Sequence, residues 1–140
     1  MKYATRMLAI VLTLMPLLAS AQLGDNGMLA KVPFQFRAGN TVIPAGQCAV
    51  QRAGLTPNTL MIRNDGAKIA LFTAARTVSA TKGSSTNAMI FHKYGARYFL
   101  SGIRVAGSTI AYQFPEGKAE AELRAQNVVA SQEIVLAQLH

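Results

Sequence analysis

The stretch FHKYGARYF, Phe91 to Phe99, gathers the side chains of this 140-residue chain that are best suited to chemistry. It contains His92, the only histidine apart from the terminal His140, with Tyr94 and Arg97 close by. An imidazole changes charge near neutral pH and can act as a base or a ligand. Aromatic rings interleaved with basic groups also occur on surfaces that bind nucleic acids or sugars. His92, Tyr94 and Arg97 are therefore the binding candidates, although hairpin packing explains the same pattern more simply.

A hydrolytic site around His92 would need an orienting carboxylate and a nucleophile within reach. Asp65 is expected in a turn, and Ser84 and Ser85 lie in a polar loop without the G-x-S-x-G pattern. A triad of His92, Asp65 and a loop serine is thus the weaker alternative. We predict no catalytic residues and a protein that is not an enzyme.

The sequence also contains no residue pattern that is typical of a metal site or a cofactor site. Glu116 and Glu120 stand four apart on one expected helix face, which is typical of solvated charge rather than of a glycosidase pair. Cys48, His92 and His140 do not supply the three or four closely spaced ligands of a zinc site. There is no phosphate loop and no dinucleotide fingerprint. We predict no metal-binding residue, no cofactor-binding residue and no cofactor.

In the segments that must position these residues, apolar and polar residues alternate with a period of two. In KVPFQFRAG the apolar Val32, Phe34 and Phe36 alternate with polar residues, which predicts a strand with one wet face. Pro33 lacks an N–H, so this strand is expected at a sheet edge or to begin there. QCAVQRA predicts a second strand with Cys48 packed inside as an inert thiol.

Further strands are predicted in TLMIRN, AKIALFTA, STIAYQF and the closing SQEIVLAQLH. Asp65-Gly66 predicts a type I′ turn between the first two of these. FHKYGARYF predicts a hairpin with Tyr94-Gly95 as its loop and with a positive φ at Gly95. This loop pairs His92 with Arg97 and leaves the imidazole at the sheet surface. The expected core face of this hairpin comprises Met89, Phe91, Tyr98 and Leu100.

One segment, PEGKAEAELRAQN, predicts a short surface helix that lies on the sheet with a thin apolar face. Pro115 suits the first helical position, Glu120 stands four before Arg124, and Asn127 is a plausible C-cap. Short strands separated by turn signals, with one helix near the C-terminus, predict an all-β, mainly antiparallel fold. We expect a small sandwich or barrel that forms a single domain over residues 29–140, preceded by a flexible lead-in over 22–28.

Residues 1–21 match a secretory signal peptide. Lys2 and Arg6 precede an apolar run, and Ala19 and Ala21 occupy the small-residue positions of a cleavage site before Gln22. The run is shorter than the about 20 apolar residues that a membrane-spanning helix needs. We predict an exported protein, periplasmic or extracellular, with no transmembrane segment in its mature chain.

The charge is strongly positive, +8 for the whole chain. After residue 21, twelve Lys and Arg face six acids, which gives +6. Such an excess favours partners such as anionic envelope polymers or lipid head groups. Nucleic acid is disfavoured, because the basic residues are scattered singly.

Three blocks in order, VPFQFRAGNTVIPAGQCAVQR, IFHKYGARYFLSGI and a Pro-started charged helix, resemble a family of small exported bacterial proteins of uncharacterised function. The resemblance covers about residues 30 to 126, and this chain differs near Cys48 and Val50, where the family more often has an aromatic residue before the valine. It implies export and a β-rich domain and no activity. The predicted function is an exported, non-enzymatic β-domain with a binding or structural role at the cell envelope. The alternatives are a small hydrolase centred on His92 and a small outer-membrane β-barrel.

Overall fold

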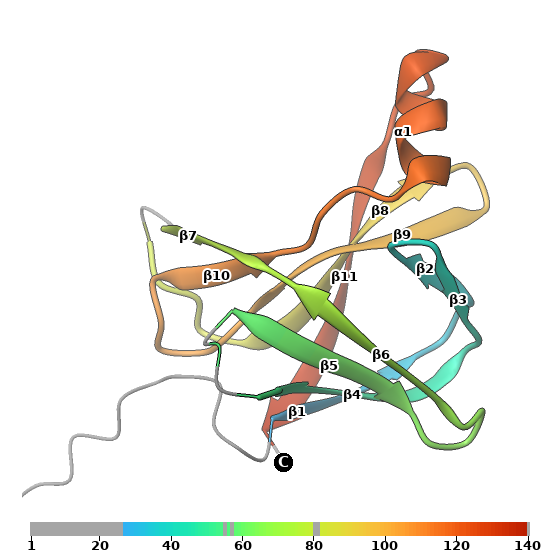
Figure 1. The fold of residues 1–140 in the computed structure, drawn as a ribbon. Helices are drawn as coiled ribbons and strands as arrows, with labels where there is room; N and C mark the ends of the chain where they lie inside the picture. Colours follow the sequence, from blue (N-terminus) through green and yellow to red (C-terminus); the bar gives the residue numbers. More distant parts are fainter. Residues whose placement is uncertain (1–26, 55, 57, 80–81, 140) are drawn as a thin grey trace, which may run out of the picture.

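The computed structural model describes residues 27–54, 56, 58–79 and 82–139 (Figure 1). The predicted signal peptide, its cleavage site at Ala19, Ala21 and Gln22, and most of the lead-in lie outside these residues. Over the described ranges no helix has the length and apolar character needed to cross a bilayer.

The fold is all-β and mainly antiparallel, as predicted, with one short helix. The helix α1 spans Lys118–Ala125. The strands are β1 (Met28–Val32), β2 (Phe36–Ala38), β3 (Thr41–Ile43), β4 (Gly46–Arg52), β5 (Thr59–Asn64), β6 (Ile69–Ala74), β7 (Arg76–Ser79), β8 (Asn87–Tyr94), β9 (Arg97–Arg104), β10 (Ile110–Gln113) and β11 (Ser131–Leu139).

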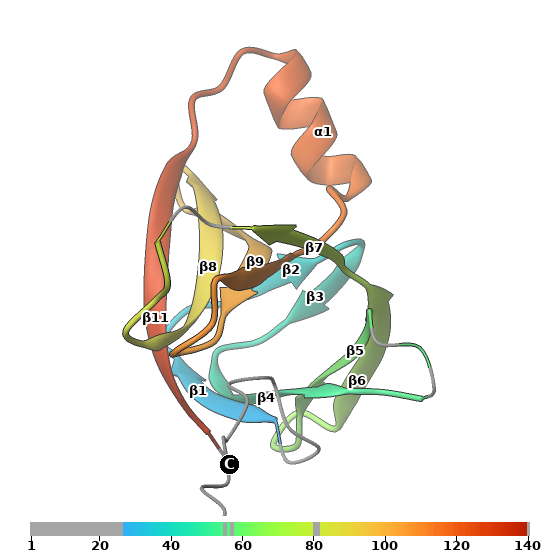
Figure 2. The same cartoon turned by 90° about the vertical axis from the view of Figure 1, so that its left-hand side faces the viewer.

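The strands form a nearly closed barrel. Neighbours follow the order β3-β2-β9-β8-β11-β1-β4-β5-β6, and β10 pairs with both β9 and β7. Since Ala75 alone separates β6 from β7, this long strand joins β5 on one side to β10 on the other and brings the sheet back to β9. Figures 1 and 2 show α1 at one end of this barrel, and β11 running from that end to the opposite one.

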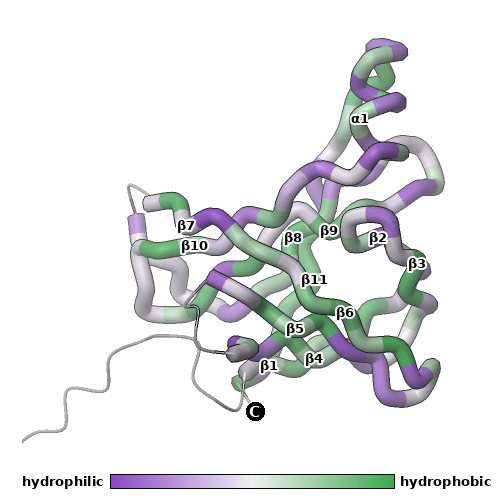
Figure 3. The backbone as a smooth tube through the Cα atoms, viewed as in Figure 1, coloured by the Kyte–Doolittle hydropathy of each residue, from purple (hydrophilic) through white to green (hydrophobic). Residues whose placement is uncertain are grey.

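The period-two pattern explains how the interior is filled. Apolar and polar residues alternate along the strands, whereas α1 carries several strongly hydrophilic residues (Figure 3). Burying apolar side chains stabilises the fold by about 25 cal/mol per Å² removed from water. Cys48 is fully buried among these side chains, which confirms its predicted place. The largest fully buried residues are Phe36, Phe91, Met28, Ile43, Leu60, Ile62, Met89, Ile103, Val32, Val50 and Cys48.

The predicted strand through KVPFQFRAG is divided in two. The strand β1 begins at Met28, inside the expected lead-in, and ends at Val32, and β2 starts at Phe36. Pro33 follows β1 directly and ends its pairing, because it has no N–H to donate. The edge prediction was wrong, since β1 pairs with β4 on one side and β11 on the other. The short strand β3 follows and pairs with β2.

The turn between β5 and β6 is longer than predicted. Asn64 pairs with Ile69, so four residues form the loop, and Lys68 rather than Asp65 or Gly66 has a positive φ, 56°. The type I′ prediction was therefore wrong. The buried Asn64 explains the geometry, because its side chain accepts a hydrogen bond from the Ala67 N–H and donates one to the Pro44 carbonyl. Asn side chains often organise turns in this way.

The hairpin in FHKYGARYF exists, but its register is two residues away from the predicted one. Tyr94 pairs with Arg97 and His92 pairs with Phe99, so Gly95 and Ala96 form the loop. Gly95 has the expected positive φ, 62°. The core face is buried at Met89, Phe91 and Leu100, as predicted. The opposite face, expected to be wet, is also packed, because Tyr94 and Phe99 are buried in edge-to-face contact.

The helix α1 begins later than predicted and is attached to the β2–β3 turn. Pro115 precedes the helix, and Gly117 is the N-cap residue without a side-chain capping bond. Instead, Asn40 accepts a hydrogen bond from the Lys118 N–H at 3.2 Å. A Cβ on Gly117 would lie 2.3 Å from the Gly39 carbonyl oxygen, so only glycine allows this approach. Asn127 follows the helix with φ 58°, a conformation common just after a helix end.

Candidate functional site

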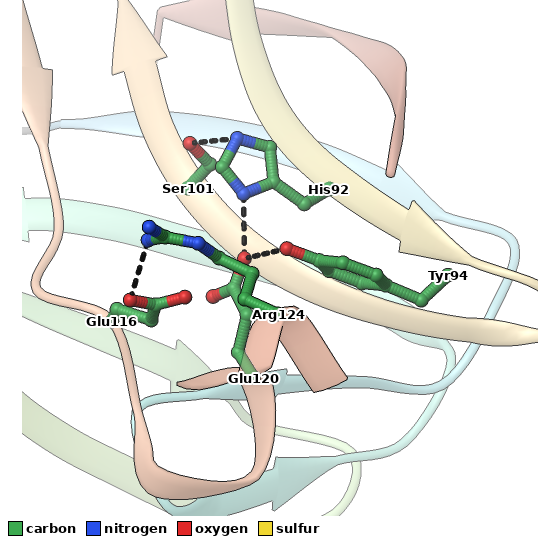
Figure 4. A network of polar contacts seen from close by, with 6 residues as sticks. All are labelled: His92, Tyr94, Ser101, Glu116, Glu120 and Arg124. Carbon is green, nitrogen blue, oxygen red and sulfur yellow. Dashed lines mark hydrogen bonds and ion pairs between the residues drawn. The ribbon is translucent and has the colours of Figure 1, made fainter. Parts of the chain in front are cut away.

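The candidate site is a hydrogen-bonded chain that joins β9, β8 and α1 (Figure 4). The Oγ of Ser101 lies 3.1 Å from Nε2 of His92, and Nδ1 of His92 lies 2.6 Å from Oε1 of Glu120. Ser101 and Glu120 therefore contact opposite nitrogens of one imidazole ring. The His92 side chain is 39% exposed, whereas that of Glu120 is only 6% exposed. The hydrogen-bonded series thus runs from the buried carboxyl group of Glu120, through His92, to the partly exposed hydroxyl of Ser101.

Tyr94 stabilises the buried end of this chain. Its hydroxyl donates to Oε1 of Glu120 at 3.1 Å, so one carboxyl oxygen is contacted by two side chains of β8. Burial, and then the negative charge of Glu120, raise the pKa of Tyr94 to about 12. The phenol therefore stays protonated and donates at any physiological pH. Two residues apart on β8, His92 and Tyr94 project to the same side of the strand, which lets both reach the helix.

A β-bulge sets the position of Ser101. Phe91 pairs with Leu100 and Ile90 pairs with Gly102, which leaves Ser101 without a partner residue on β8. The Ser101 carbonyl instead accepts a hydrogen bond from the Phe114 N–H at 2.8 Å, just beyond the end of β10. Bulges reorient side chains and are frequent beside active sites. Here the bulge accompanies the placement of the hydroxyl against His92.

A pocket of about 530 Å³ opens over this chain of residues. Its volume is within the range of about 300–1,000 Å³ that is typical of small-molecule sites. Residues from the end of β6, the start of β7, β8, β9, the end of β10 and α1 surround it. They are Ala74, Ala75, Arg76, His92, Ser101, Gln113, Phe114, Pro115, Glu116, Glu120 and Arg124.

Two guanidinium groups line the pocket, and their partners differ. Arg124 forms an ion pair with Glu116 at 2.8 Å, so the predicted pairing of Glu120 with Arg124 was wrong. Arg76 donates to the side-chain carbonyl of Gln113, which is uncharged. Its positive charge is therefore not neutralised by this partner, and Arg76 is exposed. Arg76 is therefore the cation of the pocket that is available to an anionic group.

The structure separates the three predicted binding candidates. His92 lines the pocket, and Tyr94 is buried behind it against Glu120. Arg97 is exposed at the start of β9 and lies over the ring of Phe99, with 5.5 Å between the guanidinium carbon and the ring centre. The expected neighbour of His92 was Arg97, whereas its actual contacts are Glu120 and Ser101. The three candidates do not form one site.

Asp65 and the loop serines, which were the possible triad partners of His92, do not contact it either. Asp65 forms an ion pair with Arg63 at 3.0 Å in the β5–β6 loop. Ser84 donates to the Thr86 carbonyl within its own loop. The residues that do contact His92 were assigned to a strand and to a solvated helix face. A signal was present for Glu120, since a helix with so thin an apolar face needs a polar contact to hold it against the sheet.

Within the described ranges, no group of three or more His, Cys, Asp or Glu side chains could hold a metal ion. No family model matches the chain, and no curated protein or solved structure is significantly similar to it. The resemblance to small exported bacterial proteins therefore stays a prediction.

Proposed function

We propose that this protein is an exported binding domain that holds an anionic group of an envelope polymer or lipid in the pocket beside α1. Export is supported by the signal-peptide pattern that ends at Ala21, before Gln22. The single observation that carries the binding function is Arg76. This exposed residue lines a pocket of about 530 Å³, and its guanidinium is bonded to an uncharged amide.

The chemistry of the pocket fits a carboxylate or phosphate group. A guanidinium offers several N–H donors in a planar fork that matches the oxygens of either group. The net charge of +6 after residue 21 adds a long-range attraction towards anionic surfaces, which weakens as salt increases. Phe114, Pro115 and Ala75 give the pocket an apolar wall beside these polar groups. A ligand with an anionic end and a less polar body would contact both.

The test compares two sources of the anionic group. The exported protein is titrated with galacturonic acid oligomers and, separately, with vesicles of phosphatidylglycerol or phosphatidylcholine. Binding to the oligomers or to the phosphatidylglycerol vesicles is expected, with an affinity that falls as salt rises. Arg76→Gln should weaken binding about tenfold or more, because charge-assisted hydrogen bonds typically contribute about 1.5–3 kcal/mol.

Lys31→Gln is the matched control, because Lys31 is an exposed cation on β1 that does not line the pocket. If both substitutions weaken binding equally, the attraction is a general effect of charge, and the pocket is not the site. If neither polyanion binds, the proposed function is wrong.

A further inference from the structure

We infer that Ser101, His92 and Glu120 form a nucleophile–base–acid relay that transfers acyl groups from small carboxylic esters. The inference uses the pocket of the proposed binding function but adds a reaction to it. Ser101 supplies the nucleophilic hydroxyl, His92 the general base, and Glu120 the carboxylate that orients the imidazole. Such relays are recognised by geometry and roles rather than by position in the sequence.

The first observation is the connectivity of the ring. The serine contacts Nε2 at 3.1 Å and the carboxyl group contacts Nδ1 at 2.6 Å. This assignment of the two nitrogens is the one that a serine relay requires, with Nδ1–H donated to the acid and Nε2 left to accept the serine proton. Both distances lie within reach of proton transfer, about 2.6–3.2 Å.

The second observation is that the side chains of the relay become more exposed from Glu120 to His92 and Ser101. Glu120 is almost completely enclosed and is also contacted by Tyr94, so its position is fixed from two directions. His92 and Ser101 are partly exposed and line the pocket. A purely structural contact between α1 and β8 would be complete with Glu120, His92 and Tyr94. The bulged serine at the open end of the ring is not needed for that contact.

The reaction balances with water as the second reactant. The Ser101 Oγ attacks the ester carbonyl carbon while Nε2 of His92 takes the hydroxyl proton, and the ring N–H on Nδ1 remains bonded to Glu120. The C–O bond to the alcohol then breaks, and the alcohol leaves with the proton from Nε2. Water, deprotonated by Nε2 of His92, then attacks the carbonyl carbon of the acyl-serine. The bond from that carbon to the Ser101 Oγ breaks, Oγ takes the proton back from Nε2, and the carboxylic acid is released. Arg76 and Gln113 also line the pocket, and both side chains carry N–H donors.

The pocket also limits the class of substrate. Phe114, Pro115 and Ala75 form an apolar wall suited to a short acyl chain, and Arg76 favours an anionic group elsewhere on the molecule. The expected substrates are therefore short-chain carboxylic esters, and among these the esters carried by anionic molecules should react faster.

The experiment uses the exported protein with two probes, an alkyl fluorophosphonate and p-nitrophenyl acetate. Peptide mass spectrometry should find a single phosphonyl adduct on Ser101, formed with loss of fluoride. Ser101→Ala should carry no adduct and should lose the p-nitrophenyl acetate turnover. His92→Gln should slow labelling about a hundredfold or more, because general acid–base catalysis contributes about 10²–10⁴-fold. Ser84→Ala, which removes a loop hydroxyl outside the pocket, should behave as the unchanged protein.

Thermal unfolding of each variant establishes that it is folded, and Ser101→Ala removes a single oxygen atom. The inference is overturned if Ser101 is not labelled, or if Ser101→Ala hydrolyses the ester as fast as the unchanged protein. Anion binding that depends on Arg76 without labelling of Ser101 would leave the binding function in place and reject the relay. Labelling of Ser101 without anion binding would support the relay and reject the proposed binding function.

Discussion

Cys48 shows how the barrel interior acts on one titratable residue. Its side chain is fully buried on β4, and burial raises the pKa of the thiol from 9.0 to about 11, because a thiolate is poorly solvated among apolar groups. The folded protein therefore keeps this proton up to about pH 11, whereas the unfolded chain releases it near pH 9. The contribution to stability is complete below pH 9 and is lost as the pH rises towards 11.

The expected result is a free energy of unfolding that falls between pH 9 and 11 by up to about 1.4 kcal/mol per pH unit for this one proton. Cys48→Ala should remove this part of the decrease, although it lowers stability at pH 7 by leaving a small cavity. Urea unfolding at pH 7, 9, 10 and 11 measures both effects. Equal slopes for the two proteins would contradict the burial of Cys48.

Individual residues also mark the limit of inference from the sequence. The burial of Cys48 and the positive φ of Gly95 followed from local patterns, and both are confirmed. The contact of His92 with Glu120 joins residues 28 positions apart, and no local pattern encodes such a distance. The sequence placed Glu120 on a wet helix face because carboxylates are rarely buried unless they are paired. In the structure, Glu120 is buried and is paired with His92 and Tyr94.

At the scale of elements, α1 is held by polar contacts. Its apolar residues Ala119 and Leu123 are only half-buried, and Glu120 is its only buried residue. Asn40 caps the helix N-terminus, and His92 and Tyr94 contact its middle. A helix of eight residues would hardly form alone in water, since isolated helices shorter than about 12–15 residues are marginal. Its stability therefore depends on these contacts.

Glu120→Ala is predicted to release α1 while the barrel stays folded. The change leaves the Tyr94 hydroxyl buried without its acceptor, which typically costs about 1–3 kcal/mol. Hydrogen exchange should become faster across Lys118–Ala125 and remain slow in β8 and β9. Glu122→Ala, an exposed change on the same helix, should have little effect. Unchanged exchange in the Glu120→Ala helix would show that the carboxyl group does not attach it.

The β8–β9 hairpin depends on the conformation of its turn. Gly95 has φ 62°, and a Cβ at this position would meet no atom within 4 Å. Any cost of substitution is thus conformational. Gly95→Val should lower the free energy of unfolding by about 1–2 kcal/mol, the typical cost of a left-handed conformation for a residue with a Cβ. Ala96→Val, in the same exposed turn, is the matched control and should change it by less than about 0.5 kcal/mol. Equal effects would mean that the turn geometry differs.

For the molecule as a whole, alternation predicted the class of fold, because each strand buries one face in a shared core. The number of strands and their closure were not predictable in this way. Pro33 divides one apparent strand, and Ala75 lets one long strand join both ends of the sheet. Closure is a property of pairings between distant segments, such as β7 with β10, and depends on where two backbones can approach.

Gly102 is the residue that permits this approach. It lies on β9 opposite Gln113 of β10, and a Cβ there would lie 2.4 Å from the Tyr112 carbonyl oxygen. Because that atom belongs to the backbone, β10 itself would have to move. Gly102→Ala should therefore lower the free energy of unfolding by about 1–3 kcal/mol, the usual range for overpacking a well-filled site.

Gly66→Ala is the control for this prediction. Neither glycine has a φ in the left-handed region, but a Cβ on Gly66 would lie 3.5 Å from its nearest neighbour, an ordinary contact. Urea unfolding should separate the two variants by at least about 1 kcal/mol, because only Gly102→Ala forces two strands apart. Because Ser101 precedes Gly102, the same variant should also disturb the pocket and weaken ligand binding. If both variants unfold at the same urea concentration, β9 and β10 do not close the barrel at this point.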